Sequence, residues 1–124
     1  MGNQKQHREK ADRIGRFVES IQSLGFPDWL AIAMFYRALH LVEMMLASKG
    51  RHTINHNERR EVLRSGFPEI LRQFKPLYNY SLLCRYRFVP MKAADIAPLE
   101  ARLENLKTFI DLEIAEGPTS APSA

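Results

Sequence analysis

The long apolar segment between Trp29 and Ala47 restricts the fold of this chain more than any other feature. Large apolar side chains fall on nearly every side of a helix built over it, which is typical of a central helix. These residues are Trp29, Leu30, Ile32, Met34, Phe35, Leu39, Leu41, Val42, Met44, Met45 and Leu46. Arg37, His40 and Glu43 interrupt its middle, where charges are strongly unfavourable in a bilayer. We therefore expect a buried helix of a soluble protein and no membrane span.

The residues around this segment predict where two helices begin and end. Asp28 is a suitable N-cap for the central helix, which would end at Ser48 because Gly50 stops it. An earlier helix is predicted over residues 6–24, and Pro27 prevents its continuation. Its apolar stripe consists of Ile14, Phe17, Val18, Ile21 and Leu24.

Caps, glycines and prolines divide the rest of the chain into shorter elements. We predict a loop from Arg51 to Asn57, a short helix from Glu58 to Arg64 with Asn57 as its N-cap, a helix from Pro68 to about Phe74, another from Pro76 to about Arg85, and a last helix from Asp95 to about Glu116. No segment alternates as a strand does, so the fold class is all-α, a helical bundle. With 124 residues there is room for one domain, over residues 1–116, and residues 117–124 are expected to be a disordered tail.

The cysteine count and the first residues bear on the compartment. Cys84 is the one cysteine and can form no internal disulfide, which suits a reducing cytoplasm. The first ten residues, MGNQKQHREK, are polar and lack the apolar core of a signal peptide. We expect a cytoplasmic protein.

The net charge of +4 is distributed unevenly along the chain. Between Arg72 and Lys92 there are basic residues and no acid, whereas acids outnumber bases from Asp95 onward. A basic middle followed by an acidic end indicates either a polyanion-binding face or two solvated faces that attract each other within the fold.

Most familiar catalytic and metal-binding motifs are missing from the sequence. His52 and His56 are spaced as two zinc ligands on a helix would be, but the segment reads as a loop and offers no third ligand nearby. Cys84 is more typical of a small core residue than of a nucleophile. We predict no metal site and no cofactor.

A polar segment after the central helix carries the best candidate chemistry. Arg51 is followed five residues later by His56, so that the arginine could neutralise a phosphodiester while the histidine exchanges a proton with a ribose 2′-OH. Asn55 could hold the scissile group, and Arg59 and Arg60 add positive charge. The alternative is a polar loop whose basic residues only face water.

Two stretches of the sequence resemble the HEPN superfamily of helical bundles. One is Met34-Phe35-Tyr36-Arg37-Ala38-Leu39-His40-Leu41-Val42-Glu43, followed by a helix end at Gly50 and by His56; the other is Ser81-Leu82-Leu83-Cys84-Arg85-Tyr86. The similarity spans about residues 28 to 115. It implies an antiparallel bundle of four to five helices that commonly dimerises. It also implies association with RNA or nucleotides, in toxin–antitoxin, defence or nucleotidyltransferase-linked systems.

The same resemblance suggests two interpretations of the site. Catalytic members are metal-independent endoribonucleases with an Arg-x4–6-His motif, which Arg51-x4-His56 fits with His52 in the polar position. In those members the motif lies later in the chain. Other members carry a Gly-x5-His arrangement at the third helix, which Gly50 and His56 match.

Binding without cleavage is therefore the leading hypothesis. RNA or a nucleotide phosphate would occupy a basic cleft. Its binding residues would be Arg51, His52, Asn55, His56, Arg59, Arg60, Arg85 and Arg87, and its lining would include Tyr36, Arg37, His40 and Glu43.

Two alternatives remain open. The first is an endoribonuclease that uses Arg51 and His56 as catalytic residues. The second is a protein-interaction module in which a partner covers the methionine-rich helix at Met34, Met44 and Met45. We expect a homodimer, with an antitoxin or a nucleotidyltransferase as a further partner.

Overall fold

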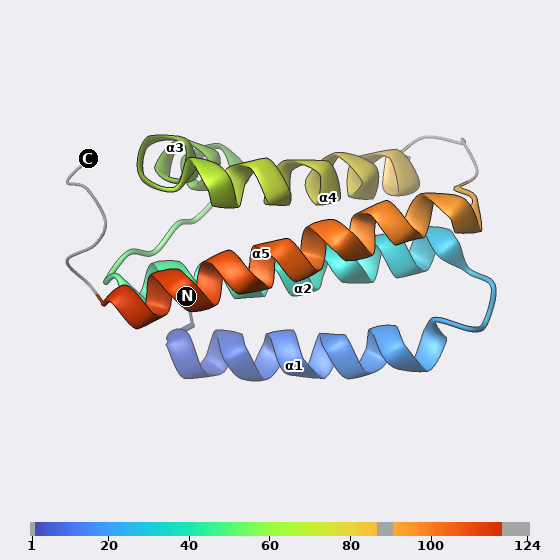
Figure 1. Cartoon of the computed structure of the whole chain (residues 1–124), viewed down its shortest axis with the longest axis horizontal. Helices are drawn as coiled ribbons and strands as arrows, with labels where there is room; N and C mark the ends of the chain where they lie inside the picture. Colours follow the sequence, from blue (N-terminus) through green and yellow to red (C-terminus); the bar gives the residue numbers. More distant parts are fainter. Residues whose placement is uncertain (1, 87–90, 118–124) are drawn as a thin grey trace.

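The computed structural model describes residues 2–86 and 91–117. These residues form five α-helices and one short 3-10 helix, with no strand among them (Figure 1). The elements are α1 (Gln4–Ile21), α2 (Pro27–Ser48), α3 (His56–Gly66), α4 (Pro68–Tyr86), η1 (Ala93–Asp95) and α5 (Ile96–Glu116). The four long helices alternate in direction along the chain (Figure 1). The prediction of an all-α helical bundle is confirmed.

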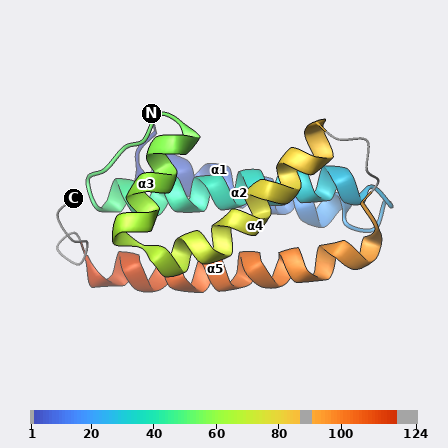
Figure 2. The same cartoon turned by 90° about the horizontal axis from the view of Figure 1, so that it is seen from above.

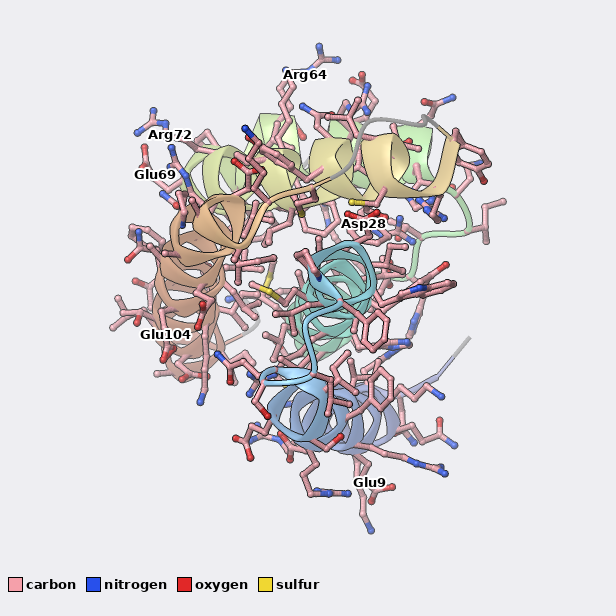
Figure 3. The ribbon with its side chains drawn as sticks, turned by 90° about the vertical axis from the view of Figure 1, so that its right-hand side faces the viewer. Glu9, Asp28, Arg64, Glu69, Arg72 and Glu104 are labelled. Atoms are coloured by element: carbon pink, nitrogen blue, oxygen red, sulfur yellow. The ribbon has the colours of Figure 1, made fainter. Side chains whose placement is uncertain are left out.

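Helix α2 is the centre of the bundle, as the apolar segment predicted. Viewed along the bundle, α1, α4 and α5 surround it (Figure 3), and it packs against all three. Met34, Met44 and Met45 are buried inside the chain itself. No partner is therefore needed to cover them, which removes the reason for an interaction surface on these methionines. Although α2 is long and apolar enough to cross a membrane, 67% of its most apolar window is buried in the bundle. That burial is compatible with a soluble protein.

Helix α4 corrects the prediction of two helices separated near Pro76. It runs unbroken from Pro68 to Tyr86 with Pro76 inside it. An internal proline costs about 3 kcal/mol because one backbone hydrogen bond is lost. Ile70, Phe74 and Leu77 all face the core on this helix. Continuous burial of that face, where α4 crosses over α2 and α5 (Figure 2), outweighs the local cost.

The start of α3 also differs from the prediction. The N-cap is Asn55 rather than Asn57, and its side-chain oxygen accepts a hydrogen bond from the backbone N–H of Glu58 at 2.8 Å. His56 is therefore the first helical residue and not part of a loop. An acid three residues after Asn55 is the usual signal for this cap, and it is present in the sequence.

Both ends of the α1–α2 connection lie earlier than expected. Helix α1 ends at Ile21 instead of Leu24, and α2 begins at Pro27 with Phe26 as its N-cap. A proline suits the first helical position, where its missing N–H has no partner to lose. Asp28, the expected N-cap, lies inside the first turn and accepts a hydrogen bond from the backbone N–H of Met91 at 3.0 Å.

A buried lysine joins the C-terminal ends of α2 and α5. The Lys49 side chain is fully buried, and its ammonium donates hydrogen bonds to the backbone carbonyls of Glu113 and Gly117. Such a cation satisfies the last carbonyls of a helix. Apart from Gly117, the expected disordered tail lies outside the described residues.

Candidate functional site

The first turn of α3 places His56 against side chains from two other helices. Its ring lies 4.9 Å from the ring of Tyr78 on α4 and 6.0 Å from that of Phe35 on α2, centroid to centroid. Its Nδ1 atom lies 2.9 Å from the Nη1 atom of Arg59, one turn further along α3. Three helices thus meet at one imidazole, and none of these contacts is local to the predicted loop.

A buried ion pair fixes Arg59 behind this histidine. Glu43 Oε1 accepts hydrogen bonds from Arg59 Nε at 2.6 Å and from Thr53 Oγ1 at 2.5 Å. Glu43 is 4% exposed and Arg59 is 7% exposed. Arg59, predicted to bind phosphate at the surface, is therefore engaged inside the protein. The network joins α2, the loop before α3, and α3 itself.

Two other arginines lie over the aromatic rings around His56. The guanidinium carbon of Arg60 is 5.6 Å from the ring centroid of Tyr78. That of Arg85 is 5.7 Å from Phe35, 5.9 Å from Tyr36 and 5.4 Å from Tyr86. These distances are within the range of cation–π interactions. We call His56, Arg60, Tyr78, Arg85 and Tyr36 the cationic–aromatic cluster.

The charges around His56 are all positive. Burial lowers the pKa of its imidazole below the ordinary 6.5, and the charges of Arg59, Arg85 and Arg60 lower that pKa further. The ring is therefore neutral at pH 7. Arginine has only donors, so the Arg59 guanidinium donates to His56 Nδ1, and the proton of the neutral ring is on Nε2. The imidazole can donate a hydrogen bond from Nε2.

A shallow hollow beside the cluster extends it along α4. It is lined by His56, Arg60, Leu71, Phe74, Lys75 and Tyr78. Neither Tyr78 nor Lys75 was among the residues predicted from the sequence. Lys75 belongs to the basic run that the sequence does display. Nothing in the local pattern marks Tyr78, because its place depends on how α4 packs against α2 and α3.

Arg72, another basic residue of that run, has a different partner. Arg72 forms an exposed ion pair with Glu69 one turn away on α4, with 2.9 Å between nitrogen and oxygen. Figure 3 shows both side chains pointing outward from the bundle, as does Arg64 on α3. Arg87, predicted as a binding residue, lies outside the described residues.

The polar strip predicted to line one cleft on α2 is divided among different neighbours. Only Glu43 reaches the network behind His56. His40 faces α1, where its Nδ1 atom lies 3.0 Å from Nδ1 of His7. Arg37 lies against Gly15 of α1, so close that a Cβ built on that glycine would be 2.9 Å from the guanidinium carbon. Of the predicted lining residues, Tyr36 alone joins the cluster at the surface.

The loop residues predicted to act with His56 are not gathered around it. Among the described residues, the side-chain partners of His56 are Phe35, Arg59 and Tyr78, and Arg51 is not one of them. Arg51 is half-buried where α2 ends, and its backbone N–H donates to the carbonyl of Leu46 at 2.8 Å. His52 is exposed and its charge acts on His7. Asn55 uses its side-chain oxygen as the cap of α3.

Comparison with models of known protein families and with curated proteins found no match to this chain.

Proposed function

We propose that this chain is a cytoplasmic, HEPN-like domain that binds RNA or a nucleotide phosphate at the cationic–aromatic cluster. The observation that carries the proposal is a neutral imidazole bordered by guanidinium groups that lie on aromatic rings. The charges that act on His56 come from Arg59, Arg85 and Arg60, with no carboxylate among them. A surface of this kind attracts phosphate electrostatically and offers ring faces on which bases can stack.

The arrangement of the arginines supports this reading. Arg60 is exposed and Arg85 is half-buried, so both guanidinium groups can reach a ligand. Arg85 Nη1 also lies 3.4 Å from the hydroxyl of Tyr36, which restrains the guanidinium at the surface. Restrained donors lose less conformational entropy on binding than free ones. Lys75, at the edge of the hollow, adds a further positive charge.

The position of the hydrogen on the neutral His56 ring favours binding over cleavage. A general base must offer a lone pair to the 2′-OH proton. In His56 the Nδ1 lone pair is used by Arg59, and Nε2 carries a hydrogen. Arg59, Phe35 and Tyr78 make the hydrogen-bond and ring contacts of the imidazole in the described part of the chain, rather than Arg51, the other half of the Arg-x4-His motif. An antitoxin or nucleotidyltransferase partner, implied by the HEPN resemblance, belongs to the same proposal.

Fluorescence anisotropy with a labelled single-stranded RNA at low salt tests the proposal. Arg60→Ala and Arg85→Ala should each weaken binding by roughly fivefold or more and make the salt dependence shallower. The matched controls are Arg64→Ala on α3 and Arg72→Ala on α4. Each removes one arginine that pairs with an exposed glutamate, so net charge changes equally but affinity should change less than twofold.

The same samples separate the alternatives. If all four variants weaken binding equally, net charge rather than the cluster explains the affinity. If a mononucleotide competes as well as the RNA does, the ligand is a nucleotide phosphate. Loss of intact RNA in EDTA would indicate the endoribonuclease. Absence of binding to either ligand at low salt would overturn the proposal.

A further inference from the structure

The buried pair of Glu43 and Arg59 lies directly behind the imidazole of the cluster. Glu43 Oε1 accepts from Arg59 Nε at 2.6 Å, and Arg59 Nη1 donates to His56 Nδ1 at 2.9 Å. These three side chains form a chain of hydrogen bonds from the interior of α2 to the surface of α3. Thr53 donates to the same oxygen of Glu43 and so anchors its inner end.

We infer that Glu43 and Arg59 are positioning residues that keep His56 neutral with its proton on Nε2, so that the site presents only hydrogen-bond donors to an oxyanion. The expected effect on oxyanion binding rests on the proposed function, but the protonation state of His56 can be measured without any ligand. Neither Glu43 nor Arg59 needs to touch the ligand, because both are buried.

The orientation of Arg59 follows from how its nitrogens are used. Its Nε donates to Glu43, which fixes the plane of the guanidinium, and Nη1 of the same plane then points at His56. A guanidinium cannot accept a hydrogen bond, so Nδ1 of His56 must accept one and stay unprotonated. Protonating His56 would place two N–H groups opposite each other. The Glu43–Arg59 pair therefore disfavours protonation of His56 through the direct contact between Arg59 Nη1 and His56 Nδ1.

The charged groups that act on the pKa of His56 are all cationic. Arg59 and Arg60 face it from α3, Lys75, Tyr78 and Arg85 from α4, and the uncharged ring of Phe35 from α2. No carboxylate acts on its pKa, which is lowered first by burial and then by Arg59. Glu43 is the nearest acid along this chain of hydrogen bonds, and its charge is used by Arg59.

This arrangement predicts which ligand atoms the cluster accepts. Imidazole Nε2–H and the guanidinium groups of Arg60 and Arg85 are all donors, so the matching partner is an atom with lone pairs and negative charge, such as a phosphate oxygen. Because the pKa of His56 is lowered, the imidazole gains less charge between pH 8 and pH 6 than an ordinary histidine would, so the affinity of the site for phosphate should change less over that range.

Side-chain NMR of the 15N-labelled protein tests the inference. Long-range 1H–15N correlations distinguish the Nε2–H tautomer, the Nδ1–H tautomer and the imidazolium. In the wild type we expect His56 as the Nε2–H tautomer at pH 7, titrating below 6.5. In the double variant Glu43→Gln/Arg59→Met, which removes both charges and leaves neither unpaired, the pKa of His56 should rise toward 6.5.

The pH dependence of RNA affinity distinguishes a positioning role of Glu43 and Arg59 from a purely structural one. Wild-type affinity for single-stranded RNA should increase less from pH 8 to pH 6 than the affinity of the double variant does. In the double variant, affinity should increase severalfold over the same range, because His56 then becomes cationic. His52→Ala, which alters an exposed histidine of the preceding loop, should keep the wild-type pH profile.

Each outcome bears on a different claim. If His56 of the wild type is the Nδ1–H tautomer, or titrates at 6.5 or above, the inference is wrong whether or not RNA binds. The inference is also wrong if His56 titrates identically in the wild type and in a folded double variant. If NMR gives the expected state of His56 but no RNA binds, the proposed function fails and the positioning role stands.

Discussion

Two histidine contacts on different sides of α2 illustrate how the same side chain serves different purposes. On the α1 side, His40 Nδ1 lies 3.0 Å from Nδ1 of His7. On the α3 side, His56 Nδ1 lies 2.9 Å from the guanidinium of Arg59. Burial is the largest cause of a lowered pKa in all three histidines.

The partners make these two contacts unlike each other. Either histidine of the His7–His40 pair can donate while the other accepts, so the contact joins two helices without fixing which ring carries the shared proton. Arg59 can only donate, and the buried carboxylate of Glu43 holds it in place. The first contact therefore contributes to docking of α1, whereas the second determines what His56 presents to solvent.

The largest effect is expected from breaking the buried ion pair on the α3 side. Glu43→Ala leaves the buried Arg59 charge without its carboxylate, which should lower the free energy of unfolding by about 3 kcal/mol or more. His40→Ala, on the α1 side, removes one hydrogen bond between neutral rings and should cost about 1 kcal/mol. Chemical denaturation of both variants measures the difference.

Glu61→Ala is the matched control for this experiment. Glu61 also pairs with an arginine, Arg64, but both side chains are 63% exposed. An exposed pair of this kind contributes roughly 0–1 kcal/mol. Equal losses of stability in Glu43→Ala and Glu61→Ala would contradict the distinction between the buried and the exposed pair.

A second effect concerns assembly through the α1 side. Phe17 is 53% exposed and Trp29 is 65% exposed, and both line an apolar hollow between α1 and α2 that also includes Tyr36. Large apolar side chains gathered on one face are typical of an interface. We expect the homodimer predicted from the HEPN resemblance to use this face, so Trp29→Glu should yield a monomer in sedimentation experiments.

Ile54→Glu provides the control for the dimer. Ile54 is even more exposed than Trp29, at 76%, but it lies in the loop before α3 and not in the apolar hollow. The substitution should leave the dimer intact. A wild-type chain that sediments as a clean monomer of about 14 kDa at tens of micromolar would refute the homodimer.

A third prediction asks which histidine contributes to RNA binding. His56→Ala removes the Nε2–H donor from the cluster and should weaken binding by roughly tenfold or more, since one hydrogen bond to a charged group contributes about 1.5–3 kcal/mol. His7→Ala should change the affinity less than twofold, because its contact is with His40 on the α1 side. Anisotropy titrations at equal salt compare them, and similar losses would show that the two sides are not independent.

The smallest effect is a pH dependence of stability. His7 and His40 have folded-state pKa values below 6.5, whereas in the unfolded chain they titrate near 6.5. Below that pH the unfolded chain binds more protons than the folded chain. The contribution of His7 and His40 to the free energy of unfolding is therefore fully present above pH 6.5. It is lost as the pH falls through their folded-state pKa values.

Denaturation curves at pH 7.5 and pH 5.0 measure this loss. His56 contributes with the same sign, since its pKa is also lowered. The double variant His7→Ala/His40→Ala should consequently lose less stability between the two pH values than the wild type, without losing all of the dependence. A folded chain whose stability rises toward pH 5.0 would contradict the direction of the three shifts.

Local patterns of the sequence were enough to predict most helices. The apolar segment around Phe35 predicted the central helix, because a helix packed against three others needs apolar residues on most of its sides. The cap of α3 was wrongly predicted at Asn57, although Glu58 follows Asn55 by three residues. The continuous α4 was not predictable, because the local rule against an internal proline was outweighed by packing of residues far away in the sequence.

The candidate site was predictable only in part. His56, Arg60 and Arg85 were all identified from the sequence, and the structure brings them together around one surface. Arg51 was selected with His56 because of its spacing in the chain, yet the imidazole is held by Arg59 instead. Spacing along a sequence gives a distance in space only within one element, and α3 begins between these two positions.

The strip of Arg37, His40 and Glu43 separates what the sequence determined from what the tertiary structure decided. Residues three apart on an α-helix drift by about 60° each, so the strip turns through roughly 120° over its length. The sequence determined that drift. On a helix surrounded by neighbours, such a drift points each residue at a different partner: Gly15, His7 or Arg59. Which partner each one meets depends on how the bundle packs around α2, and that packing alone placed Glu43 behind His56.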